Sequence, residues 1–183
     1  MNKHLSLFLM GLLLVTSKSF SQTTLNKLLW SPTHKLTVDD FSIKTKQLET
    51  TISFAQFSID YESFGFFTKN FNNKVRNWLI KSASWIDTTI DVNLSLRYQQ
   101  SLFDISEIYV RQLRCALKKN RKKLLSGNKI VDELNTIYMA AFAQRRIDYD
   151  RETKFGSDES KQMQWEKQIQ NELLQWNNYA YDK

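Results

Sequence analysis

The chain has 183 residues, of which 42% are hydrophobic, and a formal net charge of +7, which suits one folded domain with a real core. One Pro and four Gly argue against a loop-rich sandwich and against long flexible linkers. With two His and one Cys, the chain cannot close an internal disulfide, and it holds few of the ligands that a typical zinc site requires.

The first 21 residues have the pattern of a secretory signal peptide. Lys3 and His4 precede an apolar run from Leu5 to Val15, which is too short to span a bilayer. The small residues Ser19 and Ser21 favour cleavage after Ser21. We therefore predict an exported protein, periplasmic or secreted, whose residues 22–183 form a single domain with no transmembrane segment. The alternative is a retained N-terminal anchor or a buried helix.

The first half of the mature chain favours short strands. Residues 22–45 read as an irregular or short-strand entry. Apolar residues alternate from Thr51 to Tyr61 with one change of phase, which indicates a bulge. The segments Phe64 to Thr68 and Lys74 to Ile80 are further strand candidates, rich in aromatic and branched residues.

Three helices are predicted in the second half, over about 94–119, 129–146 and 158–178. Asn93, Asn128 and Ser157 are the expected N-caps, and Gly127 a stop signal. Helical spacing predicts that the middle helix buries Ile130, Leu134, Ile137 and Ala141, and that the last buries Trp165, Ile169, Leu173 and Trp176. Strands followed by helices indicate an α+β domain, with a small antiparallel sheet packed against three helices.

The first of these helices carries the most informative motif. Its residues 98–105 read Tyr-Gln-Gln-Ser-Leu-Phe-Asp-Ile, followed by Glu107 and Arg111. The helix resembles the active-site helix of a family of predicted secreted zinc-dependent proteases, which typically reads His-Glu-Gln-x-His-Phe-Asp-Ile. Residues 149–156, Tyr-Asp-Arg-Glu-Thr-Lys-Phe-Gly, resemble the family's Tyr-Asp-x-Glu-Thr-x-His-Gly. Trp30 and residues 36–41 resemble its Leu-Thr-Trp-x-Asp-Phe opening, with Val38 in place of Trp.

The resemblance implies a zincin-like fold whose zinc chemistry has been lost. In such a helix two His at i and i+4 chelate zinc with a third ligand, and the Glu between them acts as general base. Tyr98, Gln99, Leu102 and Phe155 stand at these positions here. We therefore expect no catalytic residue, no metal and no other cofactor, and we expect Leu102 and Phe155 to meet where the metal would lie. Tyr98 and Leu102 also belong to the apolar stripe of the helix, as plain core positions would.

Several residues of the resembling motifs are retained: Asp104, Glu107, Arg111, Tyr149, Asp150, Glu152 and Thr153. For Asp104, Glu107 and Arg111 a structural role is expected, with a binding role as the alternative, and the i, i+4 pair Glu107 and Arg111 is predicted to lie on the helix surface. The remaining function would be binding of an extended peptide or of another envelope protein. The rival hypothesis is a metal-dependent hydrolase with a site rebuilt from Asp104, Glu107, Asp150 and Glu152.

A run of cations follows the first helix. It comprises Lys118, Lys119, Arg121, Lys122 and Lys123, with Arg114 before it. A solvated helix end complementing the helix dipole is one interpretation, and binding of a polyanion is the other. Outside the cytoplasm the polyanion would be an anionic glycan of the envelope, and we predict no nucleic-acid partner. Cys115 is expected to be buried and inert.

Overall fold

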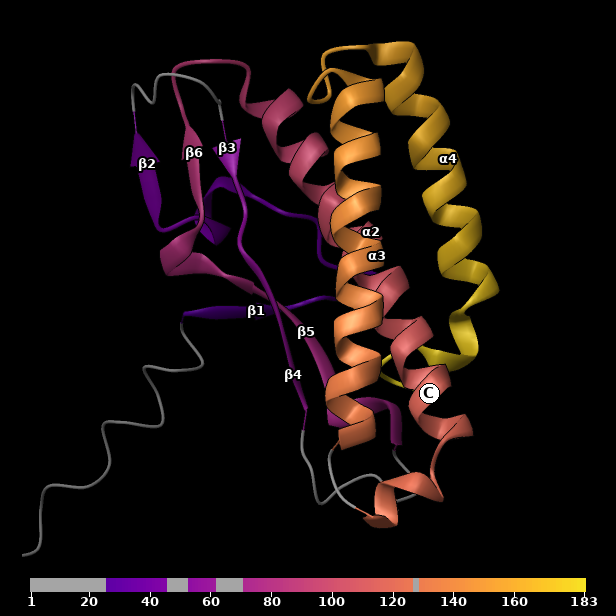
Figure 1. Cartoon of the computed structure of the whole chain (residues 1–183). Coiled ribbons are helices and arrows are strands. Elements are labelled where there is room, and N and C mark those ends of the chain that lie inside the picture. Colours follow the sequence, from indigo (N-terminus) through magenta and orange to yellow (C-terminus); the bar gives the residue numbers. More distant parts are fainter. Residues whose placement is uncertain (1–25, 46–52, 62–70, 127–128) are drawn as a thin grey trace, which may run out of the picture.

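The computed structural model describes residues 26–45, 53–61, 71–126 and 129–183. In these residues two small sheets lie on one side of a group of three helices (Figure 1), so the predicted α+β class is confirmed. The predicted signal peptide, the strand candidate Phe64 to Thr68, and the residues Gly127 and Asn128 lie outside the described residues. No helix within the described ranges is long and apolar enough to cross a membrane.

The first sheet is antiparallel, in the order β1-β5-β4. Its central strand β5 (Val75–Ile80) pairs with β1 (Lys27–Leu29) and with β4 (Phe57–Tyr61). Alternate β5 residues, Val75, Asn77 and Leu79, are buried, as the period of a strand dictates. The strand predicted from Lys74 to Ile80 is confirmed.

The second sheet is mixed, in the order β2-β6-β3. Strand β6 (Trp85–Asp87) is parallel to β2 (Ile43–Thr45) and antiparallel to β3 (Ser53–Phe54). The chain passes from this sheet to the first one between β3 and β4. The phase change predicted as a bulge is therefore a change of sheet: the Gln56 amide donates to Ser84 Oγ at 3.1 Å, and the Gln56 carbonyl accepts from the Ile80 amide at 2.8 Å.

The three helices are α2 (Val92–Lys119), α3 (Lys129–Thr153) and α4 (Glu159–Gln175). Their existence and order agree with the sequence prediction, although α3 runs a further two turns. The N-caps differ from the predicted Asn93 and Ser157. Asp91 caps α2 by accepting from the Leu94 amide at 3.0 Å, and Asp158 caps α4 by accepting from the Lys161 amide at 3.1 Å. A carboxylate at the N-cap also complements the helix dipole.

Helix α2 forms the centre of the core because it contacts both sheets and both other helices. Leu102, Ile105 and Ile108 belong to the larger hydrophobic cluster, and Leu113 and Leu117 to the smaller one; all five are fully buried. Cys115 is buried, as predicted. Surrounding one helix with packed elements explains why its polar side chains also end up in the interior.

The buried face of α3 agrees with the predicted one in part, because Ile130 and Leu134 are half-buried against the smaller cluster. Ile137 is 60% exposed and Ala141 is exposed, so their predicted burial is wrong. The face that packs on the core includes Val131, Tyr138, Phe142 and Tyr149. On α4, Trp165, Ile169 and Leu173 are buried as predicted, whereas Trp176 is half-buried at the C-cap.

Candidate functional site

The three segments that resemble the protease family are distant in the sequence and meet on α2. The Tyr98 ring stacks on the ring of Tyr149, with centroids 5.5 Å apart, and the edge of Phe155 lies against it at 6.4 Å. From the N-terminal segment, Trp30 reaches α2 at Asp104. The position that would hold the first zinc ligand is thus adjacent to the position that would hold the third.

The Tyr98 hydroxyl forms a hydrogen bond within the domain. Its hydroxyl donates to Asp150 Oδ1 at 2.5 Å, and Arg146 Nε lies 3.8 Å from the other Asp150 oxygen. Burial, followed by the hydrogen bond to Asp150, raises the pKa of Tyr98 far above its ordinary value. Burial also raises the pKa of Asp150, although Tyr98 and Arg146 act in the opposite direction. The phenol therefore keeps its proton and is a donor here.

Gln99 and Leu102 point into the protein interior. Both are fully buried; Gln99 Nε2 donates to Ser53 Oγ at 2.9 Å, and Leu102 belongs to the larger hydrophobic cluster. Gln99 Oε1 is a buried acceptor without a hydrogen-bond partner in the described structure. Both residues therefore occupy core positions; the apolar stripe predicts this for Leu102, whereas burial of Gln99 is seen only in the structure.

Phe155 does not fill a buried pocket with Leu102, because its side chain is 56% exposed. That part of the prediction is wrong. Lys154, Phe155 and Gly156 all have left-handed backbone, with φ of 51°, 57° and 85°, and this turn ends α3 with the Phe155 ring largely in solvent. The turn packs closely on α2, since a Cβ added to Gly156 would lie 3.0 Å from Tyr98 Cβ.

Asp104 connects the N-terminal segment to α2. Its Oδ1 accepts hydrogen bonds from Trp30 Nε1 at 2.8 Å and from Gln100 Nε2 at 2.9 Å. The side-chain oxygen Oε1 of Gln100 in turn accepts from the Leu36 amide at 2.9 Å. Burial raises the pKa of Asp104, against the lowering effect of the Trp30 hydrogen bond. Asp104 therefore joins Trp30 to α2, and its structural role stays a prediction.

Glu107 and Arg111 form the predicted pair, but in the interior. Glu107 Oε1 accepts from Arg111 Nε at 3.1 Å and from Arg114 Nη1 at 2.7 Å, and all three side chains are at most 4% exposed. The predicted surface location is wrong because β5 and the C-terminal segment cover this face of the helix. Arg114 Nη2 donates to the Val75 carbonyl at 2.7 Å, and its Nη1 donates to the Tyr179 carbonyl at 2.9 Å.

Arg114 is therefore no part of the exposed basic run. Arg111 also reaches a distant carbonyl, that of Leu173, at 2.6 Å, and its guanidinium lies 5.0 Å from the centre of the Trp30 ring. Sequence reasoning did not identify Arg114 as structural. The available signal is its spacing, because a residue seven positions after Glu107 lies on the same helix face.

The remaining retained residues build the connection from α3 to α4. The Tyr149 hydroxyl donates to Gln162 Oε1 at 2.7 Å, and Trp165 Nε1 donates to Glu152 Oε2 at 2.9 Å. Thr153 Oγ1 donates to the Tyr149 carbonyl at 2.7 Å and accepts from the Gly156 amide at 3.1 Å. Tyr149, Glu152 and Thr153 thus stabilise one turn, which places Phe155 beside Tyr98.

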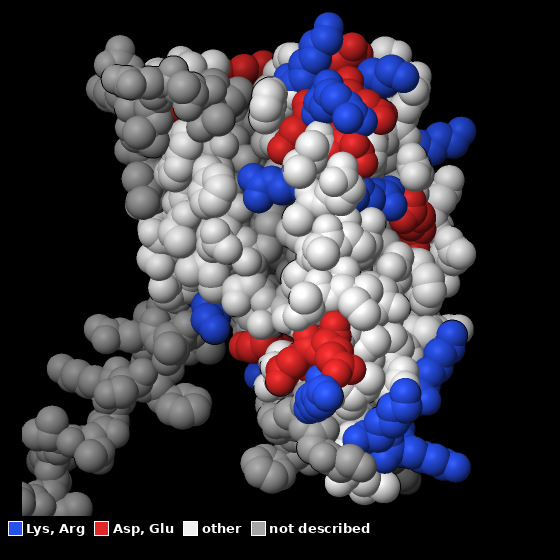
Figure 2. Space-filling model, viewed as in Figure 1, with Lys and Arg blue, Asp and Glu red and all other residues white. Residues whose placement is uncertain are grey.

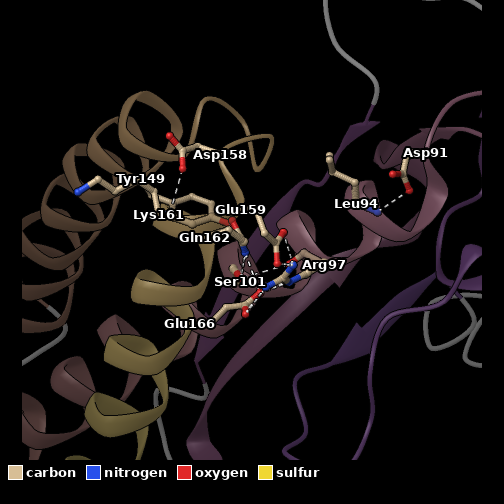
Figure 3. Close-up of polar contacts among 10 residues, drawn as sticks. All are labelled: Asp91, Leu94, Arg97, Ser101, Tyr149, Asp158, Glu159, Lys161, Gln162 and Glu166. Atoms are coloured by element: carbon tan, nitrogen blue, oxygen red, sulfur yellow. Dashed lines mark hydrogen bonds and ion pairs between the residues drawn. The ribbon is translucent and has the colours of Figure 1, made fainter.

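Arg97 is a structural residue that the sequence pattern does not reveal. Figure 3 shows its guanidinium between two carboxylates of α4, where Nη1 donates to both oxygens of Glu159 at 2.7 Å and Nε to Glu166 Oε1 at 2.5 Å. Burial alone would raise the pKa of Glu166, but hydrogen bonds from Arg97 and Gln162 hold it below its usual value. The same amide of Gln162 donates to Ser101 Oγ at 3.0 Å, which joins α4 to α2 a second time.

The four carboxylates of the rival hydrolase hypothesis have separate partners. Asp104 accepts from Trp30, Glu107 from two arginines, Asp150 from Tyr98, and Glu152 from Trp165. Among the described residues, no group of three or more His, Cys, Asp or Glu side chains is arranged to hold a metal ion.

The predicted basic run forms an exposed hollow at the end of α2, visible as a blue group at the lower right of Figure 2. The hollow has a volume of about 490 Å³ and is lined by Lys118, Lys119, Asn120, Arg121, Lys122, Lys123 and Leu125. Leu125 is 73% exposed at its edge. The Lys118 ammonium lies 5.7 Å from the centre of the Tyr179 ring. We call this surface the basic hollow.

Comparison with protein-family models, with curated proteins and with solved structures finds no match for this chain. The resemblance to secreted zinc-dependent proteases therefore stays a prediction, carried by three segments of sequence and by the contacts between them.

Proposed function

We propose that this protein is an exported, non-catalytic relative of secreted zinc-dependent proteases, and that it serves as a binding or structural protein of the cell envelope. The observation that carries the proposal is the contact between Tyr98 and Phe155. The resemblance aligns both residues with zinc ligands on sequence motifs alone, although 57 positions separate them along the chain. Their ring contact supports the alignment.

The same positions argue for the loss of catalysis. A zinc hydrolase needs a ligand set with an open coordination position and a base beside the metal-bound water. Here Tyr98 donates a hydrogen bond to Asp150, Gln99 donates one to Ser53, and Leu102 is packed in the core. Gln99 has nearly the shape of Glu but takes up no proton. What the domain offers instead are surfaces for binding, among them the strand β4, to which an extended peptide would add.

The proposal is tested first by elemental analysis of the purified protein, together with zinc titration by calorimetry. We expect no stoichiometric zinc and no binding on titration. Stoichiometric zinc would refute the assignment of Tyr98, Gln99, Leu102 and Phe155 as degenerate positions.

A reconstruction experiment tests the family assignment itself. We expect the triple variant Tyr98→His/Leu102→His/Phe155→His to bind zinc, because the alignment assigns one ligand to each position and position 98 contacts position 155. The double variant Tyr98→His/Phe155→His is the matched control and should bind at least about tenfold more weakly, since it lacks one ligand. Circular dichroism verifies that both variants fold. Equal zinc affinity of the two folded variants would argue against the alignment.

Export is tested separately by the intact mass of protein recovered from the envelope and medium fractions. Cleavage after Ser21 would leave Gln22 as the first residue. A mass that includes residues 1–21 would instead favour the retained anchor.

The basic hollow favours a second candidate function, binding of anionic envelope glycans. It combines five cationic side chains with a concave surface and an exposed Leu125. Substituting Lys119, Lys122 and Lys123 by Gln should weaken binding to purified lipopolysaccharide and reduce its dependence on salt. The control replaces the exposed Lys154, Lys161 and Lys167 by Gln, which removes equal charge elsewhere. Equal loss in both triple variants would indicate a general charge effect and no specific site.

A further inference from the structure

One face of α3 has the spacing of a helix-pairing seam and no partner in the described structure. The face consists of six residues separated by alternating steps of four and three: Glu133, Ile137, Ala140, Gln144, Ile147 and Arg151. We call it the α3 seam. All six side chains are exposed, and the two isoleucines are 60% and 56% exposed. Steps of four and three define the contact positions of a coiled coil.

The seam lies opposite the buried face of α3, in front of the helix group. Figure 1 shows α3 standing before α2, and Figure 2, in the same view, shows a band without charged side chains across its middle. Charged groups border this band at both ends. The seam includes Ile137, whose apolar character leads the sequence pattern to predict burial, although the structure leaves it 60% exposed.

The chemistry of the seam is complementary to itself when two copies run in opposite directions. A two-fold axis near residue 142 brings Ile137 of one copy opposite Ile147 of the other, and Glu133 opposite Arg151. Ala140, a small residue that permits close approach, then faces Gln144. In heptad terms, Glu133, Ala140 and Ile147 are d positions, and Ile137, Gln144 and Arg151 are a positions. Each pair across the axis therefore joins an a position to a d position, as antiparallel helix pairing requires.

We infer that α3 pairs with α3 of a second copy of this chain, antiparallel and about a two-fold axis. The occupant is a second copy because an isologous contact needs one surface that complements itself. The end charges supply this complementarity. Glu133 and Arg151 contact Lys129 at 3.7 Å and Asp148 at 2.8 Å within α3, yet their side chains remain 52% and 67% exposed and can also face a second copy. Within one helix these residues are about 27 Å apart and cannot pair with each other. One helix pair buries less area than a standard interface, so the dimer is reversible.

The test measures the dissociation constant of the purified protein by sedimentation equilibrium. Glu133→Arg and Arg151→Glu each oppose like charges across the axis, and each should raise the dissociation constant at least about tenfold. The double variant Glu133→Arg/Arg151→Glu restores opposite charges and should return to within about threefold of the unsubstituted protein. A protein that remains monomeric up to its solubility limit overturns the inference. A double variant as weak as the single ones does so as well.

Cross-linking tests the direction of the helices. In a Cys115→Ser background, Ile137→Cys and Ile147→Cys are made as separate proteins and oxidised alone or mixed. The mixture should give a disulfide-linked dimer at least about tenfold faster than either protein alone, because only residues 137 and 147 face each other. Equal rates in the mixed and unmixed samples would overturn the antiparallel arrangement. Circular dichroism verifies the fold of every variant.

Discussion

The hydroxyl of Tyr98 donates a hydrogen bond of 2.5 Å to the carboxylate of Asp150, and this contact joins the N-terminal part of α2 to the C-terminal part of α3. The resemblance to zinc proteases places a metal ligand at Tyr98 and a retained acid at Asp150. In this protein the two side chains form a hydrogen bond with each other. Two residues that the resemblance assigns to an active site thus form a hydrogen bond that joins two helices.

Tyr98→Phe should lower the free energy of unfolding by about 1 to 2 kcal/mol, because it leaves Asp150 a partly buried acceptor without its closest donor. Urea denaturation followed by circular dichroism measures the change. Tyr181→Phe is the control, since no hydrogen bond of the Tyr181 hydroxyl occurs within the described structure. Equal stability of the Tyr98 variant and the unsubstituted protein would show that the Tyr98 hydrogen bond contributes nothing.

Glu107→Gln should destabilise the protein by about 3 kcal/mol or more, because two buried guanidinium groups lose their shared counter-charge. Thermal and urea unfolding give the difference. The control is Asp60→Asn, whose carboxylate lies 3.7 Å from Lys27 with both side chains at least 34% exposed; it should cost less than about 1 kcal/mol. Similar losses in the two variants would argue against a special contribution of the interior pair.

Asp104→Asn tests the raised pKa of the Asp104 carboxyl. Asn keeps an oxygen that can accept from both Trp30 and Gln100, but it does not titrate. Because the folded protein holds a proton on Asp104 above the ordinary pKa of 3.8, the unsubstituted protein should lose stability relative to the Asn variant as pH rises from 3.8 through the folded pKa. Urea unfolding at a series of pH values measures this difference.

Glu166→Gln provides a control of opposite sign. The pKa of Glu166 is held below its ordinary value of 4.5. The ionised carboxylate therefore stabilises the folded protein above pH 4.5, and this contribution is lost as pH falls through the folded pKa. The two variants should therefore diverge from the unsubstituted protein in opposite directions with pH. Parallel pH profiles would contradict at least one of the two pKa shifts.

Gly156→Ala should destabilise the protein by about 1 to 3 kcal/mol, because the left-handed backbone disfavours a side chain and the new Cβ approaches Tyr98. Lys154→Gly should instead stabilise the protein by up to about 1 kcal/mol. Lys154 is exposed and its backbone has a left-handed φ of 51°, which glycine adopts more readily than lysine. Melting temperatures of the two variants, compared in one buffer, test the pair. A stable Gly156 variant would mean that the turn relaxes away from α2.

Local patterns were sufficient for much of the fold. The apolar stripe through Leu102, Ile105 and Leu113 predicts the buried face of α2 correctly, because a single well-defined stripe allows one orientation. The aromatic and branched residues from Lys74 to Ile80 likewise predict β5. The same reasoning fails for α3, where Ile137 and Tyr138 are neighbours on different faces and the pattern supports more than one buried side.

The sequence by itself determined the order of strands and helices and the central position of α2. Only the tertiary structure decided that Glu107 and Arg114 are buried, because the groups that compensate them include the distant carbonyls of Val75 and Tyr179. It also decided that Phe155 lies beside Tyr98 yet remains in solvent. Periodicity reports which residues share a face; burial of a charge depends on partners that folding brings from elsewhere in the chain.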